Sequence, residues 1–167
     1  MASILLRCAG GTLELPALVL NDRKDGGHLV VNPPRPVWER SELSPSELTS
    51  WGFLVAASGQ AMLEALPQLR SGCVNYWDAG NWALNDAALP EGRKDPRAHR
   101  KVHLHIFGRS PEASSGDWRW GEAPRFPEYS RAREWAAGFQ PLTAAECDAV
   151  TRRAEELLGE KFGMELR

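Results

Sequence analysis

The sequence predicts an α+β fold built on an antiparallel sheet, and the order of its elements is the main reason. Stretches with the spacing of strands and two capped amphipathic helices follow one another without strict alternation. With 167 residues, 43% of them hydrophobic and 25% charged, the chain can bury a core. We therefore expect a single domain over 1–167, with a core over about 13–110 and a C-terminal extension over about 111–167.

The first predicted elements are two strands joined by a charged turn. Leucines are spaced along 13–21, apolar residues run together in 27–32, and the sequence DRKDGG separates the two stretches. Three prolines within 33–36 end the second strand, because proline cannot donate a hydrogen bond to an interior ladder. A further short strand is predicted over 73–77.

Capping boxes predict the two helices. The sequence SPSE at 44–47 starts a helix that ends before Pro67, with a core face of Leu48, Trp51, Val55, Met62 and Leu66. The sequence TAAE at 143–146 starts the last helix, which ends near Gly163 and has a core stripe of Cys147, Val150, Ala154, Leu157 and Leu158. Between them, 108–142 is a Trp- and Pro-rich loop region whose Trp118 and Trp120 we expect to pack over the sheet, with stacking on a nucleobase as the alternative.

Composition excludes several classes of protein. A net charge of −2 argues against a protein that grips a nucleic-acid polymer. No apolar run approaches the roughly 20 residues of a membrane-spanning helix, so no membrane partner is expected. Cys8, Cys73 and Cys147 form no paired motif, which favours a reducing cytoplasm over a disulfide framework.

The strand predicted over 101–107 carries the residues suited to chemistry. Lys101, His103 and His105 alternate with apolar residues, so they share one face, with the two histidines about 6.5 Å apart at a rise of ~3.3 Å per residue. A neutral imidazole can attack phosphorus and leave again, provided that an acceptor such as a backbone carbonyl holds its other nitrogen. The neighbouring lysine makes the face suitable for a phosphate.

The same histidines allow two other interpretations. A His-X-His strand is often only an exposed polar face. Alternatively, His99, His103 and His105 could converge on zinc or iron, as in the two-histidine strand of cupins. No acidic ligand stands in a suitable place, and Lys101 would repel a cation, so we expect no metal site.

Several stretches in the same order resemble the histidine-triad (HIT) superfamily. KVHLHIFGR at 101–109 is similar to its signature of alternating histidines and apolar residues. LVLNDRKDGGHLVVNPPRPVWERSELSPSEL at 18–48, CVN at 73–75 and DAGN at 78–81 resemble the stretches that precede the signature. The resemblance implies an antiparallel sheet with packed helices, a homodimer, and an enzyme that hydrolyses or transfers nucleotides or nucleotide conjugates at the α-phosphate without a cofactor.

The resemblance also implies roles for individual residues. His103 matches the nucleophile that forms a nucleotidyl-histidine, His105 matches the histidine that contacts the phosphate or helps the leaving group, and His28 matches a histidine that supports the site. For nucleotide binding, the resemblance implies that Asp22 or Asn21 holds the ribose and that Asn75 is the asparagine on the phosphate side. Asn81 is a further nucleotide-binding candidate.

The chain departs from the family pattern at Lys101, which stands where the first triad histidine is expected. Its backbone carbonyl can still orient His103 and its ammonium can neutralise phosphate charge, so we expect activity. The alternative is a nucleotide-binding module with little turnover. The polar stretch 85–99 is a second departure; phosphate contacts would come from Arg93, Lys94, Arg97 or Arg100, unless this basic loop is merely solvated.

Overall fold

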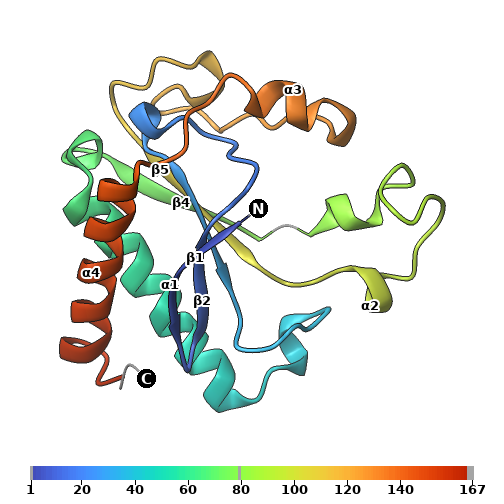
Figure 1. Ribbon diagram of the computed structural model, residues 1–167, viewed down its shortest axis with the longest axis horizontal. Helices are drawn as coiled ribbons and strands as arrows, with labels where there is room; N and C mark the ends of the chain where they lie inside the picture. Colours follow the sequence, from blue (N-terminus) through green and yellow to red (C-terminus); the bar gives the residue numbers. More distant parts are fainter. Residues whose placement is uncertain (1, 79, 165–167) are drawn as a thin grey trace.

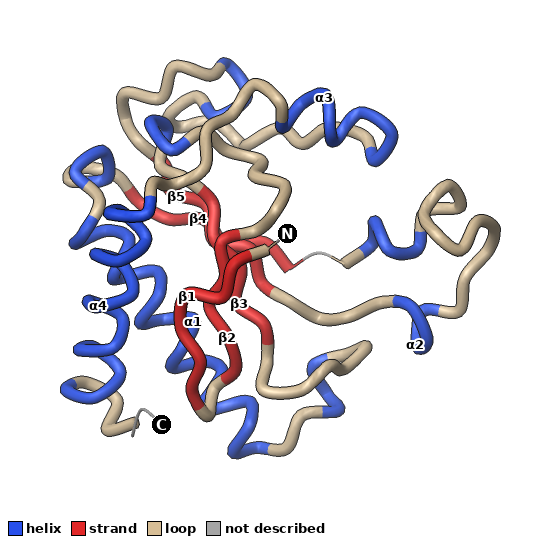
Figure 2. Tube along the Cα trace, in the orientation of Figure 1, coloured by secondary structure: helices blue, strands red, loops and turns tan. Residues whose placement is uncertain are grey.

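The computed structural model describes residues 2–78 and 80–164, and it confirms the α+β fold class. The strands are β1 (Ser3–Cys8), β2 (Gly11–Leu15), β3 (His28–Asn32), β4 (Cys73–Asp78) and β5 (Leu104–Arg109). The helices are α1 (Pro45–Ala65), α2 (Pro96–His99), α3 (Ala132–Ala136) and α4 (Ala144–Glu160). Figures 1 and 2 show the strands at the centre of the molecule, with α1 and α4 side by side on one side of them.

The five strands form one antiparallel sheet in the order β1-β2-β3-β5-β4. Two predicted strands had wrong bounds. The first ends at Leu15 instead of continuing to residue 21, because Pro16 follows. The strand predicted over 101–107 begins only at Leu104, because the amide of Val102 donates to the carbonyl of Val37 outside the sheet. Strand β1, which pairs with β2, was not predicted.

The two long helices bury one face of the sheet. Helix α4 buries every residue of its predicted stripe, and both predicted capping boxes are present. Helix α1 turns a slightly different face inward than predicted: Trp51, Leu54 and Met62 are buried, whereas Leu48 in its first turn is 44% exposed. Because Leu29 and Ile106 point into this core, the alternate residues of β3 and β5 point to the opposite face.

The C-terminal extension covers part of that opposite face. Trp118 is fully buried, its ring packs 4.9 Å from that of Phe107, and its indole N–H donates to the carbonyl of Leu20 at 3.0 Å. The expectation that Trp118 packs over the sheet is therefore confirmed. The buried carboxylate of Asp25 anchors the same segment, accepting hydrogen bonds from the backbone amides of Ser114 and Ser115.

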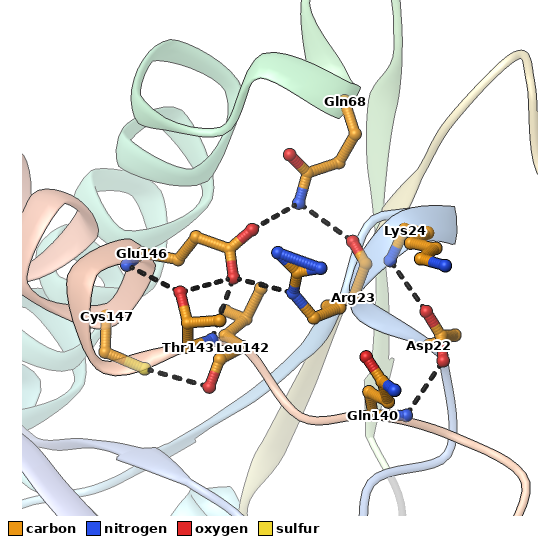
Figure 3. A network of polar contacts seen from close by, with 9 residues as sticks. All are labelled: Asp22, Arg23, Lys24, Gln68, Gln140, Leu142, Thr143, Glu146 and Cys147. Atoms are coloured by element: carbon orange, nitrogen blue, oxygen red, sulfur yellow. Dashed lines mark hydrogen bonds and ion pairs between the residues drawn. The ribbon is translucent and has the colours of Figure 1, made fainter.

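A polar network ties the turn before β3 to the start of α4 (Figure 3). Glu146 accepts hydrogen bonds from the Arg23 side chain at 3.1 Å and from Thr143 at 2.8 Å. Asp22 accepts from the amides of Lys24 and Gln140, each at 2.8 Å. The turn that leads into β3 is thus fixed from both sides. Within the described residues, no helix combines the length and the apolar character needed to cross a bilayer.

Candidate active site at three linked histidines

Three of the four histidines meet on the face of the sheet opposite the long helices. His28 begins β3, His105 lies in β5, and His103 stands two residues before it, just outside the strand. Strands β3 and β5 are neighbours, and His28 pairs with Phe107, so its ring reaches the ring of His105 diagonally. The structure therefore brings together the three histidines that the sequence singled out.

The three rings form one continuous hydrogen-bonded chain. The amide of Leu20 donates to Nδ1 of His28 at 3.2 Å, and Nε2 of His28 lies 2.8 Å from Nδ1 of His105. Nε2 of His105 lies 3.0 Å from Nε2 of His103, whose Nδ1 is 2.8 Å from the carbonyl oxygen of Lys101. A backbone donor begins the chain and a backbone acceptor ends it.

The two backbone groups fix the tautomer of every ring. Since the Leu20 amide is a donor, His28 must carry its proton on Nε2 and give that hydrogen bond to His105. His105 then carries its proton on Nε2 and donates to Nε2 of His103. His103 keeps its proton on Nδ1, facing the Lys101 carbonyl, and presents an unprotonated Nε2.

Burial reinforces this neutral state. His28 is only 1% exposed, and burial followed by the nearby His105 and His103 lowers its pKa well below the ordinary 6.5. Burial, with His103 as the second cause, lowers the pKa of His105 to about 3. The three neutral rings carry three ring protons. A fourth proton would place two ring N–H groups opposite each other, or one ring N–H opposite the amide of Leu20, and either arrangement loses a hydrogen bond. Burial thus favours the neutral forms of His28 and His105, and the direction of the hydrogen bonds leaves a lone pair on Nε2 of His103.

Ion pairs hold the segment that supplies the Lys101 carbonyl. Arg100 contacts Glu39 at 3.2 Å and Asp78, at the end of β4, at 3.8 Å. The guanidinium of Arg97 lies over the ring of Trp38, 5.0 Å from its centre. Two of the arginines considered for phosphate contacts therefore have structural partners.

Lys94, a third basic residue of the polar stretch, donates to the backbone carbonyls of Asn85 and Gly92. Lys101 itself is exposed, and it borders an open groove together with Arg7 and Asn32. None of the three linked histidines lines this groove, and the contact of Lys101 with His103 is made by its backbone carbonyl.

A mostly aromatic cavity of about 160 Å³ adjoins the histidine chain at His105. It is lined by Leu20, Trp77, Asn81, Trp82, His105, Phe107 and Phe126. An engineered apolar cavity of roughly 150 Å³ holds a benzene ring, so this one has the size for a flat ring system. Phe126 and Trp77 pack against each other with ring centres 4.4 Å apart.

Of the remaining predicted nucleotide-binding residues, one lines the aromatic cavity and two form hydrogen bonds elsewhere. Asn81 lines the aromatic cavity, whereas Ala79 in the same stretch lies outside the described residues. Asn21 is fully buried and donates to the carbonyls of Gly27 and Gly108, and Asp22 belongs to the network of Figure 3. Neither lines the cavity at His105.

Asn75 on β4 contacts Arg109 on the neighbouring strand β5. Its side-chain oxygen accepts a hydrogen bond from Arg109 at 2.6 Å, and it borders a different cleft from the one at His105. The structure thus brings Asn81 to the histidines, and it places Asn75 farther along the same face of the sheet.

Sequence reasoning missed the walls of the cavity. Trp77 was predictable as a side chain on the face of β4 that carries the histidines, because Trp77 pairs with His105 in the antiparallel register. Trp82 comes from a short 3-10 helix and Phe126 from an irregular segment, and in neither does a sequence periodicity indicate the direction of the side chain.

The alternative metal site has no matching cluster. Across 2–78 and 80–164, no group of three or more His, Cys, Asp or Glu residues is arranged to hold a metal ion. His99 ends the short helix α2, and no hydrogen bond joins it to the chain of three histidines.

No protein-family model matches the chain, and no curated protein matches it. The resemblance to the histidine-triad superfamily therefore depends on the quoted motifs alone.

Proposed function

We propose that the chain is a nucleotide hydrolase or nucleotidyl transferase that acts at an α-phosphate through a covalent intermediate on His103. The observation that supports this proposal most strongly is the histidine chain, whose backbone ends leave Nε2 of His103 unprotonated. A nucleophile of this kind must be neutral at working pH, and it must be able to leave again in the second step.

In the first step, the Nε2 lone pair of His103 forms an N–P bond while the bond from phosphorus to the leaving group breaks. The leaving group takes the bond's electron pair and, where it is an amine, a proton from solvent. The Nε2–H of His105, which in the free protein donates to His103, turns to a phosphate oxygen and stabilises the developing charge. In the second step, water attacks phosphorus, the N–P bond breaks, and the water proton is released to solvent.

The aromatic cavity supports a nucleotide as the substrate class. A nucleobase is a flat ring system that stacks on aromatic side chains, and the cavity offers Trp77, Trp82 and Phe126 within reach of His105. Lys101 is exposed and stands two residues before His103, and we propose that its ammonium compensates phosphate charge where the family has a histidine.

Incubation with a panel of adenosine and guanosine phosphoramidates and polyphosphates tests the proposal. We expect release of a nucleoside monophosphate from at least one of them, and acid quenching should trap the nucleotide on His103, located by peptide mass spectrometry. Nucleotide binding without turnover would instead favour the binding-module interpretation. Failure of every member of the panel to bind would overturn the nucleotide assignment.

We also propose that the protein forms a homodimer in a reducing, cytoplasmic environment. Strand β4 is an edge of the sheet and carries Tyr76 and Trp77, 47% and 46% exposed, and an open edge of this kind can pair with a second copy. All three cysteines are free. Sedimentation equilibrium should give twice the 18.5 kDa mass of one chain, and the mass of a single chain would overturn the dimer.

A further inference from the structure

Arg109 is a buried cation at the far end of the strand that carries His105. The residue is only 5% exposed, and its guanidinium donates to Asn75 and to the backbone carbonyls of Arg119 and Glu122 at 2.6–2.9 Å. It shares the face of His105, because the two residues are an even number of positions apart in β5. Four residues at ~3.3 Å each place Arg109 about 13 Å along the strand from His105.

The positive charge of Arg109 has no counter-ion among the residues that the structure describes. The acceptors of its hydrogen bonds are neutral oxygens, and no carboxylate of these residues forms an ion pair with it. Its Nε–H is also buried without a partner. Burial of a charge is costly unless an opposite charge accompanies it, so an arginine held in this way favours an anion from outside the chain.

An open cleft of about 510 Å³ gives such an anion access to Arg109. Its walls include Cys73, Asn75 and Trp77 from β4, together with the segment 120–124. Trp77 lines this cleft and also the aromatic cavity at His105, so the two hollows are adjacent. The carboxylate of Glu122 borders the cleft too, and its partner is the exposed Arg119 at 3.4 Å.

We propose that this cleft is a second subsite, which binds a phosphate or carboxylate group on the part of the substrate that departs from His103. The role as a leaving-group subsite depends on the proposed function, whereas anion binding at Arg109 does not. The backbone spacing of about 13 Å between His105 and Arg109 selects for leaving groups that are long enough to extend from the histidines to this cleft. A short leaving group would leave the subsite empty.

Asn75→Asp tests the subsite without disturbing the loop that Arg109 holds. The new carboxylate keeps the hydrogen bond from Arg109 and supplies the missing counter-ion, so it should displace an external anion. Asn85→Asp is the matched control, because it adds the same charge at an exposed residue that does not line the cleft. Both variants should keep the near-ultraviolet circular dichroism of the wild type.

Cys73 provides the readout. The residue is exposed and lines the cleft, and its backbone position on β4 is paired with that of Arg109 on β5. Tripolyphosphate and citrate serve as the phosphate and carboxylate probes. We expect one of them, at millimolar concentration, to slow alkylation of Cys73 by iodoacetamide at least fivefold in the wild type and in Asn85→Asp, and less than twofold in Asn75→Asp. Each rate is compared with that of the same variant without the probe.

Protection by tripolyphosphate alone identifies a phosphate subsite, and protection by citrate alone identifies a carboxylate subsite. Equal protection in the wild type and Asn75→Asp, or none with either probe, would show that Arg109 only ties the loop to the sheet. The assay requires no turnover. If a nucleotide is trapped on His103 but neither probe protects Cys73, the subsite alone is overturned. If a probe protects Cys73 but no nucleotide is turned over, only the proposed reaction is overturned.

Discussion

Replacement of His103 by asparagine is expected to reduce turnover by about 1,000-fold or more, because it removes the atom that attacks phosphorus. The asparagine amide occupies the place of Nδ1 and can still donate to the Lys101 carbonyl, so the segment that supplies this carbonyl keeps its hydrogen bond. His103 is partly exposed and contributes little to the core, so the free energy of unfolding should change by less than about 1 kcal/mol. Steady-state turnover and urea unfolding measure the two effects separately.

Lys101→Met is the matched comparison, because it keeps the backbone carbonyl that orients His103 and removes only the ammonium. If the ammonium meets phosphate charge in the transition state, turnover should fall by about 10- to 100-fold, equivalent to about 1–3 kcal/mol, and Lys101→His should restore part of it. Near-normal turnover in His103→Asn would contradict the covalent mechanism. An unchanged rate in Lys101→Met would contradict only the electrostatic role of the lysine.

Local sequence information was sufficient for the two long helices and for two of the three histidines. The alternation around Leu104 and Ile106 placed His103 and His105 on one face, and the capping boxes placed both long helices. Each of these signals lies within a few consecutive residues, so it can be read without knowing how distant segments of the chain pack. The arrival of His28 beside His105 required β3 and β5 to be neighbours, which only the family resemblance suggested.

The rest of the site depends on contacts between distant segments. Phe126 closes the aromatic cavity because Trp118 and Asp25 anchor the extension over the sheet, and no periodic pattern in 108–142 indicates this. Asn21 and Asp22 have the polarity of ribose-binding residues, yet the structure uses both side chains in hydrogen bonds to backbone groups. In the sequence, Arg109 is only the last residue of the motif at 101–109, because burial of a cation without a counter-ion is visible only in three dimensions.

Acidification is expected to destabilise the protein between pH 7 and pH 5, before most carboxylates titrate. His28 and His105 have folded-state pKa values below the ordinary 6.5. In this pH range the unfolded chain therefore binds protons at these two residues, whereas the folded chain does not. Stability that depends on these histidines is complete above pH 6.5 and decreases as the pH falls below it. Each histidine lowers the free energy of unfolding by about 2 kcal/mol at pH 5, at a limiting slope of about 1.4 kcal/mol per pH unit.

Urea unfolding at pH 7, 6 and 5 measures this loss, which should total about 4 kcal/mol for the pair. Glu47, whose hydrogen bond from Arg35 lowers its pKa to about 2, and Glu64, whose pKa is lowered chiefly by Arg153, act only below about 4.5 and do not contribute in this window. His105→Asn removes one of the two groups, so its loss between pH 7 and pH 5 should be about half that of the wild type. Equal losses in the two proteins would contradict the neutral histidine chain, because that chain requires His105 to resist protonation as long as the fold persists.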